Sequence, residues 1–302
     1  MKNKSLISIN DYSKEDQLKI LEVAEEFEKN PVQNILQDYV IASLFFEPST
    51  RTRLSFESAA NRLGGKVVGF SEASNTSVKK GESLRDSILT VANYSDLIIM
   101  RNPLEGSARF ASEISPVPII NAGDGSNQHP TQTLLDLYSI KKTQNNLDNL
   151  HVAFIGDLKY GRTVHSLVIA LCNFNTTFHL VSPQELKLPS AVKMFIKEKN
   201  LEYHQYVDIE DVTEKADVMY MTRIQKERFS DPLEYERIKD FYVLRKNMIE
   251  NSKENLTILH PLPRVNEIEI EVDKSPKAYY FEQALNGVFV RQALMSLILG
   301  LK

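Results

Sequence analysis

The feature of the sequence that most constrains the fold is a series of short apolar runs that alternate with segments of helical pattern. The runs are too short for helices and are rich in β-branched residues, as is typical of buried strands. They cover residues 41–46, 66–70, 97–100, 152–155, 177–181, 218–221 and 256–259. The segment at residues 56–63 has apolar side chains at helical spacing and is followed by Gly64 and Gly65, which favour a helix end. This alternation predicts parallel sheets that are covered by helices on both faces.

The length of the chain, 302 residues, favours two domains, because one domain typically takes roughly 150 residues. The most linker-like stretch, residues 141–149, is polar and rich in asparagine, and it follows a helical pattern with several leucines. We therefore expect the domain junction near residues 133–150. The final helix, expected over residues 284–301, is apolar on most of its surface and must pack deeply against one of the domains.

Composition and charge exclude several classes of protein. Hydrophobic residues make up 42% of the chain and charged residues 25%, which is usual for a soluble globular protein. No apolar run approaches the ~20 residues of a membrane-spanning helix, and residues 1–10 lack the core of a secretory signal, so we expect a cytoplasmic protein. The net charge of −4 argues against a nucleic-acid partner. The single cysteine, Cys172, lies in an apolar helical pattern that favours a structural role, and no side-chain cluster has metal-ligand spacing, so neither a metal nor another cofactor is expected.

A phosphate site is indicated at residues 49–53, Ser-Thr-Arg-Thr-Arg, which follow the first apolar run and open a helix. Ser49 suits the N-cap position of that helix. The positive helix end, its free N–H groups, three hydroxyls and the guanidinium of Arg51 all favour an anion such as phosphate. The alternative is an ordinary N-cap with two solvated arginines.

A second candidate site lies at residues 121–132, a polar loop with two glycines that follows the strand-like residues 117–120 and precedes a helix. Loops at the carboxyl ends of parallel strands commonly bind ligands. His129 could donate a hydrogen bond to a carbonyl oxygen and stabilise the charge that develops there, an effect typically worth ~3 kcal/mol. The alternative is a histidine that only caps the helix.

Residues 156–163, Gly-Asp-Leu-Lys-Tyr-Gly-Arg-Thr, have the glycine spacing of a P-loop but do not match its chemistry. Arg162 stands where the P-loop needs a lysine, and Asp157 would place a carboxylate inside the phosphate nest. We therefore disfavour a nucleotide site and expect Arg162 to bind a carboxylate. The sequence contains no Gly-x-Gly-x-x-Gly fingerprint, which disfavours a nicotinamide or flavin enzyme.

Polar or proline-locked groups also follow three further runs. These groups are Arg101 after residues 97–100, Arg223 and Gln225 after residues 218–221, and His260-Pro261-Leu262-Pro263-Arg264 after residues 256–259. Taken singly, each is as readily a surface arginine or a stiff turn. Five strand ends that carry such groups together predict convergence on one site.

The motifs at residues 49–53, 124–132 and 260–264, in this order, resemble those of the transcarbamoylase family, and the resemblance covers nearly the whole chain. Arg223-x-Gln225 and His260-Pro-Leu-Pro resemble the aspartate branch of the family. Ornithine enzymes usually carry a His-Cys-Leu-Pro motif and a Ser-Met-Gly loop, whereas this chain has Pro261 and its cysteine lies elsewhere.

The fold that the resemblance implies consists of two doubly wound α/β domains. Residues 1–134 and 285–302 would form the carbamoyl phosphate-binding domain, and residues 135–284 the aspartate-binding domain. The C-terminal helix would pack back on the first domain.

The resemblance also implies roles for individual residues in binding carbamoyl phosphate. The phosphate would bind Ser49, Thr50, Arg51 and Thr52, the carbonyl oxygen Thr52, Arg101 and His129, and the amino group Gln132. Of these, Arg51, Thr52, Arg101 and His129 are the candidate catalytic residues. The backbone of Pro261 and Leu262 would lie close to the reacting amine, and the family often has a cis peptide bond before the residue equivalent to Pro263.

The two carboxylates of aspartate would bind Arg162, Arg223 and Gln225, again by resemblance. Active sites of the family lie between the subunits of a trimer, and residues 77–81 resemble the loop that enters the neighbouring subunit's site. Ser77 and Lys80 would then act in the neighbouring site, with Lys80 reaching aspartate. Thr76 and Lys79 are alternatives for that contact.

The activity implied by the resemblance is transfer of the carbamoyl group from carbamoyl phosphate to the amino group of L-aspartate, giving N-carbamoyl-L-aspartate and phosphate, an early step of de novo pyrimidine biosynthesis. The expected assembly is a homotrimer, with or without regulatory chains. Three alternatives stay open: a transcarbamoylase that acts on ornithine or an unusual amine, a non-catalytic relative that only binds ligands, and a P-loop nucleotide binder.

Overall fold

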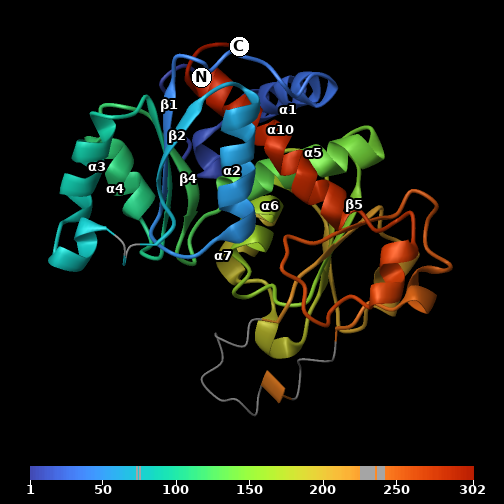
Figure 1. Cartoon of the computed structure of the whole chain (residues 1–302). Coiled ribbons are helices and arrows are strands. Elements are labelled where there is room, and N and C mark those ends of the chain that lie inside the picture. Colours follow the sequence, from blue (N-terminus) through green and yellow to red (C-terminus); the bar gives the residue numbers. More distant parts are fainter. Residues whose placement is uncertain (73, 75, 225–234, 237–241) are drawn as a thin grey trace. The chain divides into compact units, whose positions relative to one another are not determined.

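The computed structural model describes all residues except 73, 75, 225–234 and 237–241. It divides into two compact units, Met1–Tyr138 with Ala284–Lys302, and Ser139–Gln283. Each unit contains one sheet of parallel strands with helices packed on it (Figure 1), so the predicted α/β fold is confirmed. Within the described ranges, no helix is long and apolar enough to cross a membrane.

The sheet of the first unit has the strand order β2-β1-β3-β4, and all its strands are parallel. The strands are β1 (Val40–Phe45), β2 (Lys66–Phe70), β3 (Leu97–Asn102) and β4 (Ile119–Asp124). The helices are α1 (Lys14–Lys29), α2 (Thr50–Arg62), α3 (Leu84–Ala92), α4 (Ser107–Ile114), α5 (Pro130–Gln144) and α10 (Tyr280–Ile298), with short 3₁₀ helices at Ile9–Asp11 and Ser77–Lys80. Because parallel crossovers are right-handed and the strand order reverses at β1, α2 and α3 lie on opposite faces of the sheet (Figure 1).

The sheet of the second unit is also parallel, with the order β7-β6-β5-β8-β9. Its strands are β5 (His151–Ile155), β6 (Thr177–Val181), β7 (Tyr203–Tyr206), β8 (Val218–Met221) and β9 (Thr257–Leu259). The helices are α6 (Arg162–Leu171), α7 (Ser190–Glu198) and α8 (Glu210–Thr213), with 3₁₀ helices at Gln184–Leu186, Lys246–Ile249 and Ile270–Lys274. The predicted runs at 177–181 and 218–221 have the observed bounds, whereas β7 was not predicted.

The C-terminal helix α10 belongs to the first unit from Ala284 onward. Within that unit, Gln292 Nε2 donates to the carbonyl oxygen of Pro31 at 2.7 Å, and Asn3 N–H donates to the carbonyl oxygen of Ile298 at 2.8 Å. The predicted return of this helix to the first domain is confirmed, although the helix begins at Tyr280 rather than at residue 284.

Two other expectations have clear outcomes. Cys172 is buried at the end of α6, as expected for a structural thiol, and burial raises its pKa to about 12. The expected polar linker at residues 141–149 is partly wrong, because α5 continues to Gln144. Gln144 is itself buried and donates to backbone oxygens of Asp217 and Asn255, which explains how a polar residue extends the helix.

Candidate active site

The N-terminus of α2 is open toward a ligand. Ser49 occupies the N-cap position with extended backbone, but its hydroxyl accepts no capping hydrogen bond from the helix, contrary to the simple expectation for an N-cap serine. Thr50 and Arg51 are exposed, while Thr52 is buried in the first turn. The first-turn N–H groups and the hydroxyl of Ser49 are therefore not consumed by a side-chain cap, and the positive helix end favours an anion.

Two arginines concentrate positive charge at this helix end. Partial burial of the guanidinium and the positive charge of Arg101 lower the pKa of Arg51. Arg101 is held by Glu47, whose Oε1 accepts from its Nε at 2.7 Å. The Arg101 carbonyl oxygen also accepts from Phe46 N–H at 2.9 Å, which ties the end of β3 to the loop before α2. Two neighbouring cations that repel each other form a site whose energy is lowered by a bound anion.

The strand order explains why these groups meet. The strand order reverses between β1 and β3, since β2 lies on one side of β1 and β3 on the other. Residues 49–52 follow β1 and Arg101 lies at the end of β3, so both flank this switch point. His129 follows β4, the next strand of the sheet. The carboxyl ends of parallel strands at a switch point are the usual place for a ligand in this kind of fold.

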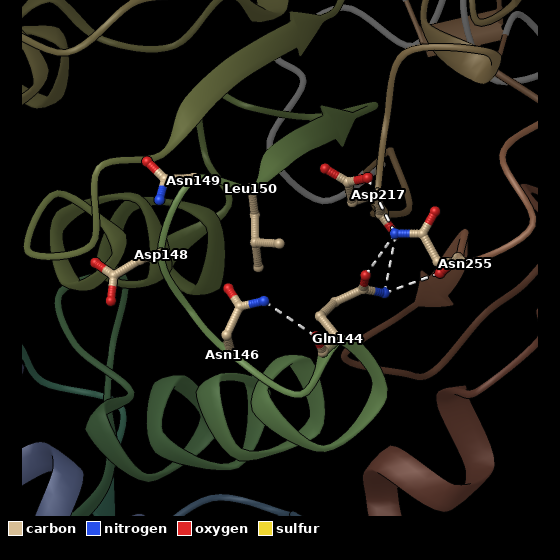
Figure 2. Close-up of a pocket in the computed structure, with 7 residues that line it drawn as sticks. All are labelled: Gln144, Asn146, Asp148, Asn149, Leu150, Asp217 and Asn255. Atoms are coloured by element: carbon tan, nitrogen blue, oxygen red, sulfur yellow. Dashed lines mark hydrogen bonds between the residues drawn. The ribbon is translucent and has the colours of Figure 1, made fainter.

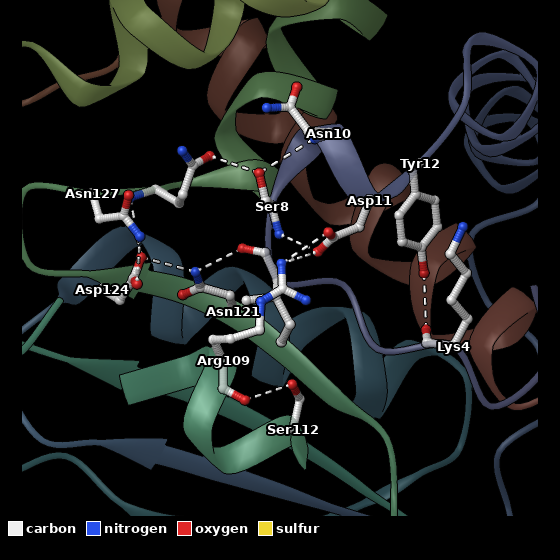
Figure 3. A network of polar contacts seen from close by, with 12 residues as sticks. Lys4, Ser8, Asn10, Asp11, Tyr12, Arg109, Ser112, Asn121, Asp124 and Asn127 are labelled. Atoms are coloured by element: carbon white, nitrogen blue, oxygen red, sulfur yellow. Dashed lines mark hydrogen bonds and ion pairs between the residues drawn. The ribbon is translucent and has the colours of Figure 1, made fainter. Parts of the chain in front are cut away.

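The loop that carries His129 is organised by Asp124, which is buried at the end of β4 (Figure 3). Its Oδ1 accepts from Asn121 Nδ2 and from Gln128 N–H, both at 3.0 Å. Its Oδ2 accepts from Gly106 N–H and Asn127 Nδ2, also at 3.0 Å. A carboxylate that accepts four hydrogen bonds fixes the loop, because removing it would take the acceptor from all four donors, of which Asn121 is buried.

His129 and Gln132 lie at the start of α5. His129 is buried, with 5% of its surface exposed, and its carbonyl oxygen accepts from Gln132 N–H at 3.0 Å. Gln132 is also buried, and its Nε2 donates to Asp136 Oδ1 at 2.8 Å, one helical turn further on. The helix start therefore presents both side chains from one rigid turn.

The segment Ser77–Lys80 forms a 3₁₀ helix after β2. The Thr76 side chain accepts from Val78 N–H at 3.3 Å and begins the turn. Ser77, Lys79 and Lys80 lie on the surface of this turn, and none of them is buried.

In the second unit, the loops after β5 and β8 are joined by hydrogen bonds. Thr222 Oγ1 accepts from Asp157 N–H at 3.0 Å and donates to the Ile155 carbonyl oxygen at 2.9 Å. Gly156 has φ +111°, and a side chain there would collide with the Thr222 backbone. Asp157 Oδ1 accepts from the N–H groups of Lys159 and Tyr160 at 3.1 and 2.9 Å. The carboxylate thus occupies two N–H groups of the loop, which agrees with the sequence argument against a nucleotide.

Arg162 and Arg223 follow these two loops. Arg162 is the first residue of α6, and Arg223 comes directly after Thr222. Both are half-buried. The order of this sheet reverses between β5 and β8, so the two arginines flank its switch point, as Arg51 and Arg101 do in the first unit. Gln225, the third predicted carboxylate ligand, lies outside the described residues.

The turn after β9 is held by His260, which is buried. Its Nδ1 accepts from Leu262 N–H at 2.7 Å, so its Nε2 is the nitrogen that donates to Glu267 Oε1, at 2.6 Å. Glu267 Oε2 in turn accepts from Val265 N–H at 3.0 Å. Leu262 has φ +57°, a conformation that a bulky residue adopts only when its surroundings impose it. The Leu262–Pro263 peptide bond is cis, as the resemblance implied.

A separate polar pocket lies at the opposite ends of the strands of the second sheet (Figure 2). It has a volume of about 500 Å³ and is lined by Gln144, Asn146, Asp148, Asn149, Leu150, Asp217 and Asn255. Its amides bond to one another and to Asp217, whose Oδ1 accepts from Asn255 Nδ2 at 3.1 Å. Because it lies at the amino ends of β5, β8 and β9, this pocket is not part of the candidate site.

Sequence reasoning missed the acidic residues that hold the site in shape. These acids are Glu47, Asp124 and Glu267. Each accepts a hydrogen bond from a predicted substrate-binding residue or from a residue next to one. Asp124 lies inside a motif and could have been recognised, since an aspartate in a glycine loop typically bonds to nearby N–H groups. Glu47 gave no such signal, because its partner Arg101 is remote in sequence.

Comparison with known proteins gives an independent result for the whole chain. Residues 4–142 match the family described as "Aspartate/ornithine carbamoyltransferase, carbamoyl-P binding domain". Residues 148–298 match "Aspartate/ornithine carbamoyltransferase, Asp/Orn binding domain". The chain belongs to the aspartate/ornithine carbamoyltransferase family.

Relatives within this family are similar over their full length. An aspartate carbamoyltransferase catalytic subunit from Parabacteroides distasonis is 60% identical over 302 residues, which cover 100% of this chain and 99% of the relative. One from Bacteroides fragilis is 58% identical, covering 100% and 98%. The catalytic subunit of M. jannaschii aspartate transcarbamoylase superposes with a TM-score of 0.92 at 49% identity, covering 98% of each chain.

A further solved structure was determined with carbamoyl phosphate and aspartate bound. This aspartate transcarbamoylase from Trypanosoma cruzi has a TM-score of 0.93 at 37% identity, covering 99% of this chain and 97% of the other. The family prediction made from the sequence motifs is therefore confirmed.

Proposed function

We propose that this chain is an aspartate carbamoyltransferase, which transfers the carbamoyl group of carbamoyl phosphate to the amino group of L-aspartate in de novo pyrimidine biosynthesis. The observation that carries the proposal is the pair Arg51 and Arg101, which lie close together at the switch point of the first sheet and at a helix N-terminus. A relative that is 60% identical over the whole chain is an aspartate carbamoyltransferase catalytic subunit.

The first unit supplies the groups that carbamoyl phosphate needs. Its phosphate binds the N-terminal turn of α2 through Ser49, Thr50, Arg51 and Thr52. The carbonyl oxygen accepts hydrogen bonds from Thr52, Arg101 and His129, and the carbamoyl amino group donates to Gln132. The position of these residues at three neighbouring strand ends supports this assignment.

The second unit supplies the groups that aspartate needs. Arg162 and Arg223 bind its carboxylates, assisted by Gln225, since a planar guanidinium matches a carboxylate with two parallel hydrogen bonds. The backbone of Pro261 and Leu262 lies close to the reacting amine. The left-handed Leu262, held by the His260 imidazole, supports this role, because such conformations cluster at ligand sites.

The reaction requires no covalent intermediate with the protein. The aspartate amine attacks the carbamoyl carbon and forms a C–N bond, and the oxyanion that develops is stabilised by Arg101 and His129. The C–O bond to phosphate then breaks, and the departing phosphate accepts the proton released by the amine. Holding both substrates in line lowers the barrier by roughly 7 to 11 kcal/mol, whereas one hydrogen-bond donor lowers it by ~3 kcal/mol. Positioning of the substrates therefore contributes most to the rate.

We also propose that the active assembly is a cytoplasmic homotrimer, with or without regulatory chains. Ser77 and Lys80 would enter the neighbouring subunit's site, where Lys80 meets the negative charge of aspartate. The surface position of Ser77, Lys79 and Lys80 on a short 3₁₀ helix supports this, because such a segment is accessible to another subunit.

The test is release of phosphate from carbamoyl phosphate by the purified protein, with aspartate, ornithine or no amine added, and without nucleotide. We expect release with aspartate alone. Release with ornithine alone would retain the phosphate site and overturn the assignment of Arg162 and Arg223. Absence of release with either amine, together with carbamoyl phosphate binding, would indicate a non-catalytic relative.

A further inference from the structure

The most deeply buried cation of the first unit lies on α10, outside the residues assigned above. Arg291 is 2% exposed, and burial lowers its pKa to about 9 although the negative charge of Asp136 raises it. Its guanidinium lies 4.8 Å from the ring centroid of Phe56 on α2. Gly287, one turn earlier, leaves room for it, since a side chain at that position would collide with Arg291 Nη1.

The negative charge of Asp136 acts on this cation, and Asp136 also bonds to a residue of the candidate site. It is fully buried on α5, and its Oδ1 accepts from Gln132 Nε2 at 2.8 Å. An ionised carboxylate only accepts hydrogen bonds, so it selects the amide orientation in which the Gln132 NH₂ group faces Asp136. The amide carbonyl oxygen then points the other way. A carbamoyl amino group is a donor and needs this acceptor.

We propose that Asp136, backed by the positive charge of Arg291, is a positioning residue that turns the Gln132 amide so that its carbonyl oxygen receives the carbamoyl amino group. The inference rests on the proposed function and extends it. The pair would thereby give the site its preference for a carbamoyl group over an acyl group of the same shape.

Stability alone does not account for the pair. Burying two charges costs several kcal/mol per ion, and well-packed apolar residues of similar volume are often as stabilising. Arg291 Nε is buried and has no hydrogen-bond partner among the residues that the structure describes, so the burial cost is not fully compensated. Asp136, one member of this costly pair, bonds directly to Gln132, a predicted substrate-binding residue. This contact fits a role in orienting the Gln132 side chain.

The test compares carbamoyl phosphate with acetyl phosphate, in which a methyl group replaces the amino group. Calorimetric titration of the full-length protein should show that Asp136→Asn weakens carbamoyl phosphate binding about tenfold, because an amide in place of the carboxylate no longer enforces the orientation of Gln132. Acetyl phosphate binding should change less than about twofold, since its methyl group needs no acceptor. Asp96→Asn, which alters an exposed carboxylate bonded to Val40 N–H at the amino end of the sheet, should change neither affinity.

Two further variants separate an effect on the Gln132 amide from a general destabilisation. Arg291→Met removes the buried cation. It should also reduce the ratio of the affinity for carbamoyl phosphate to the affinity for acetyl phosphate. The double variant Gln132→Met with Asp136→Asn should lose no more preference than Gln132→Met alone, since both changes act through one amide. A merely structural role would weaken both ligands equally.

The outcomes separate this inference from the proposed function. An unchanged preference in folded Asp136→Asn and Arg291→Met would overturn the inference while leaving the transfer activity intact. Loss of preference in both variants would support it. If the unaltered protein binds carbamoyl phosphate selectively but transfers nothing to aspartate, the proposed function fails and the positioning role stands.

Discussion

The two units place arginines at the same topological point but stabilise their surroundings by different means. In the first unit, Glu47 forms an ion pair with Arg101 directly, so an acid holds a cationic side chain. In the second unit, Asp157 and Glu267 accept from backbone N–H groups and so fix the turns that precede or follow the site. The first unit thus fixes one of its arginines through a direct ion pair, in addition to the backbone contacts of Asp124, whereas Asp157 and Glu267 fix the backbone of the second unit's turns.

The largest effect is expected from Arg51→Ala, which tests the site of the first unit. Loss of the guanidinium removes the two parallel hydrogen bonds to phosphate and leaves Arg101 as the remaining charge of the two arginines. The maximal rate should therefore fall by about 10³-fold or more. Steady-state phosphate release measures this. Arg109→Ala is the matched control, since Arg109 pairs with Asp11 on the surface of the same unit and its loss should leave the rate unchanged (Figure 3).

His129→Ala should lower the maximal rate by about 10²-fold with both substrates saturating, because a donor worth ~3 kcal/mol to the oxyanion is lost. His204→Ala, at a half-exposed position of β7, serves as the control. A maximal rate that stays unchanged in His129→Ala would reduce His129 to a structural residue.

Arg223→Ala should act on the second unit alone. We expect the aspartate concentration at half-saturation to rise by about 10-fold to 10²-fold, since one charge-assisted pair is lost, while carbamoyl phosphate affinity is retained. Arg245→Ala, which removes a partly exposed ion pair with Glu269, is the control. An unaltered aspartate dependence would contradict the assignment of the second site.

Glu47→Gln sharpens the comparison, because it tests whether the first site depends on an acid outside the predicted ligands. Removing the charge weakens the bond to Arg101 Nε. Turnover should fall about tenfold because the affinity for carbamoyl phosphate falls, while the affinity for aspartate is unchanged. Glu57→Gln, which affects an acid 3.6 Å from Arg53 on the same helix, should have little effect. Equal losses in the two variants would point to general destabilisation.

The second sheet also contains a histidine ladder that the described strands of the first sheet lack. His151, His179 and His204 stack on β5, β6 and β7, with 3.1 Å between His151 Nδ1 and His179 Nε2. Burial, and the positive charge of His151 and His204, lower the pKa of His179 to about 4. The imidazole is therefore neutral in the folded protein at any pH above that value.

Acid should accordingly destabilise the second unit through His179. Between about pH 6.5 and pH 4 the unfolded chain binds a proton that the folded chain does not, so the free energy of unfolding falls as the pH falls, by up to roughly 3 kcal/mol. Above about pH 6.5 this stability is fully present. Denaturant unfolding near neutral pH and again just above the pKa of His179 measures the difference, which should be smaller in His179→Gln. An equal pH dependence in both proteins would exclude His179 as its source.

The strands, their parallel arrangement and the helix starts could be predicted because each depends on a local pattern. The run 66–70 became β2 with the predicted bounds. The strand β7 escaped prediction because Tyr203–Tyr206 is a partly exposed edge strand of polar and aromatic residues, without an apolar run. The positions of Arg101, Arg162 and Arg223 at strand ends followed from the sequence, whereas the contact of Glu47 with Arg101 depends on tertiary packing. The substrate roles of these residues stay predictions.

The buried pair on α5 and α10 also limits how this protein can change over evolutionary time. A substitution at Asp136 removes the negative charge that raises the pKa of the buried Arg291, and a substitution at Arg291 leaves Asp136 buried without that cation, so either change alone should destabilise the first unit. Either position can therefore drift only if its partner changes with it. Two residues that lie far apart in the chain should thus be inherited as one unit.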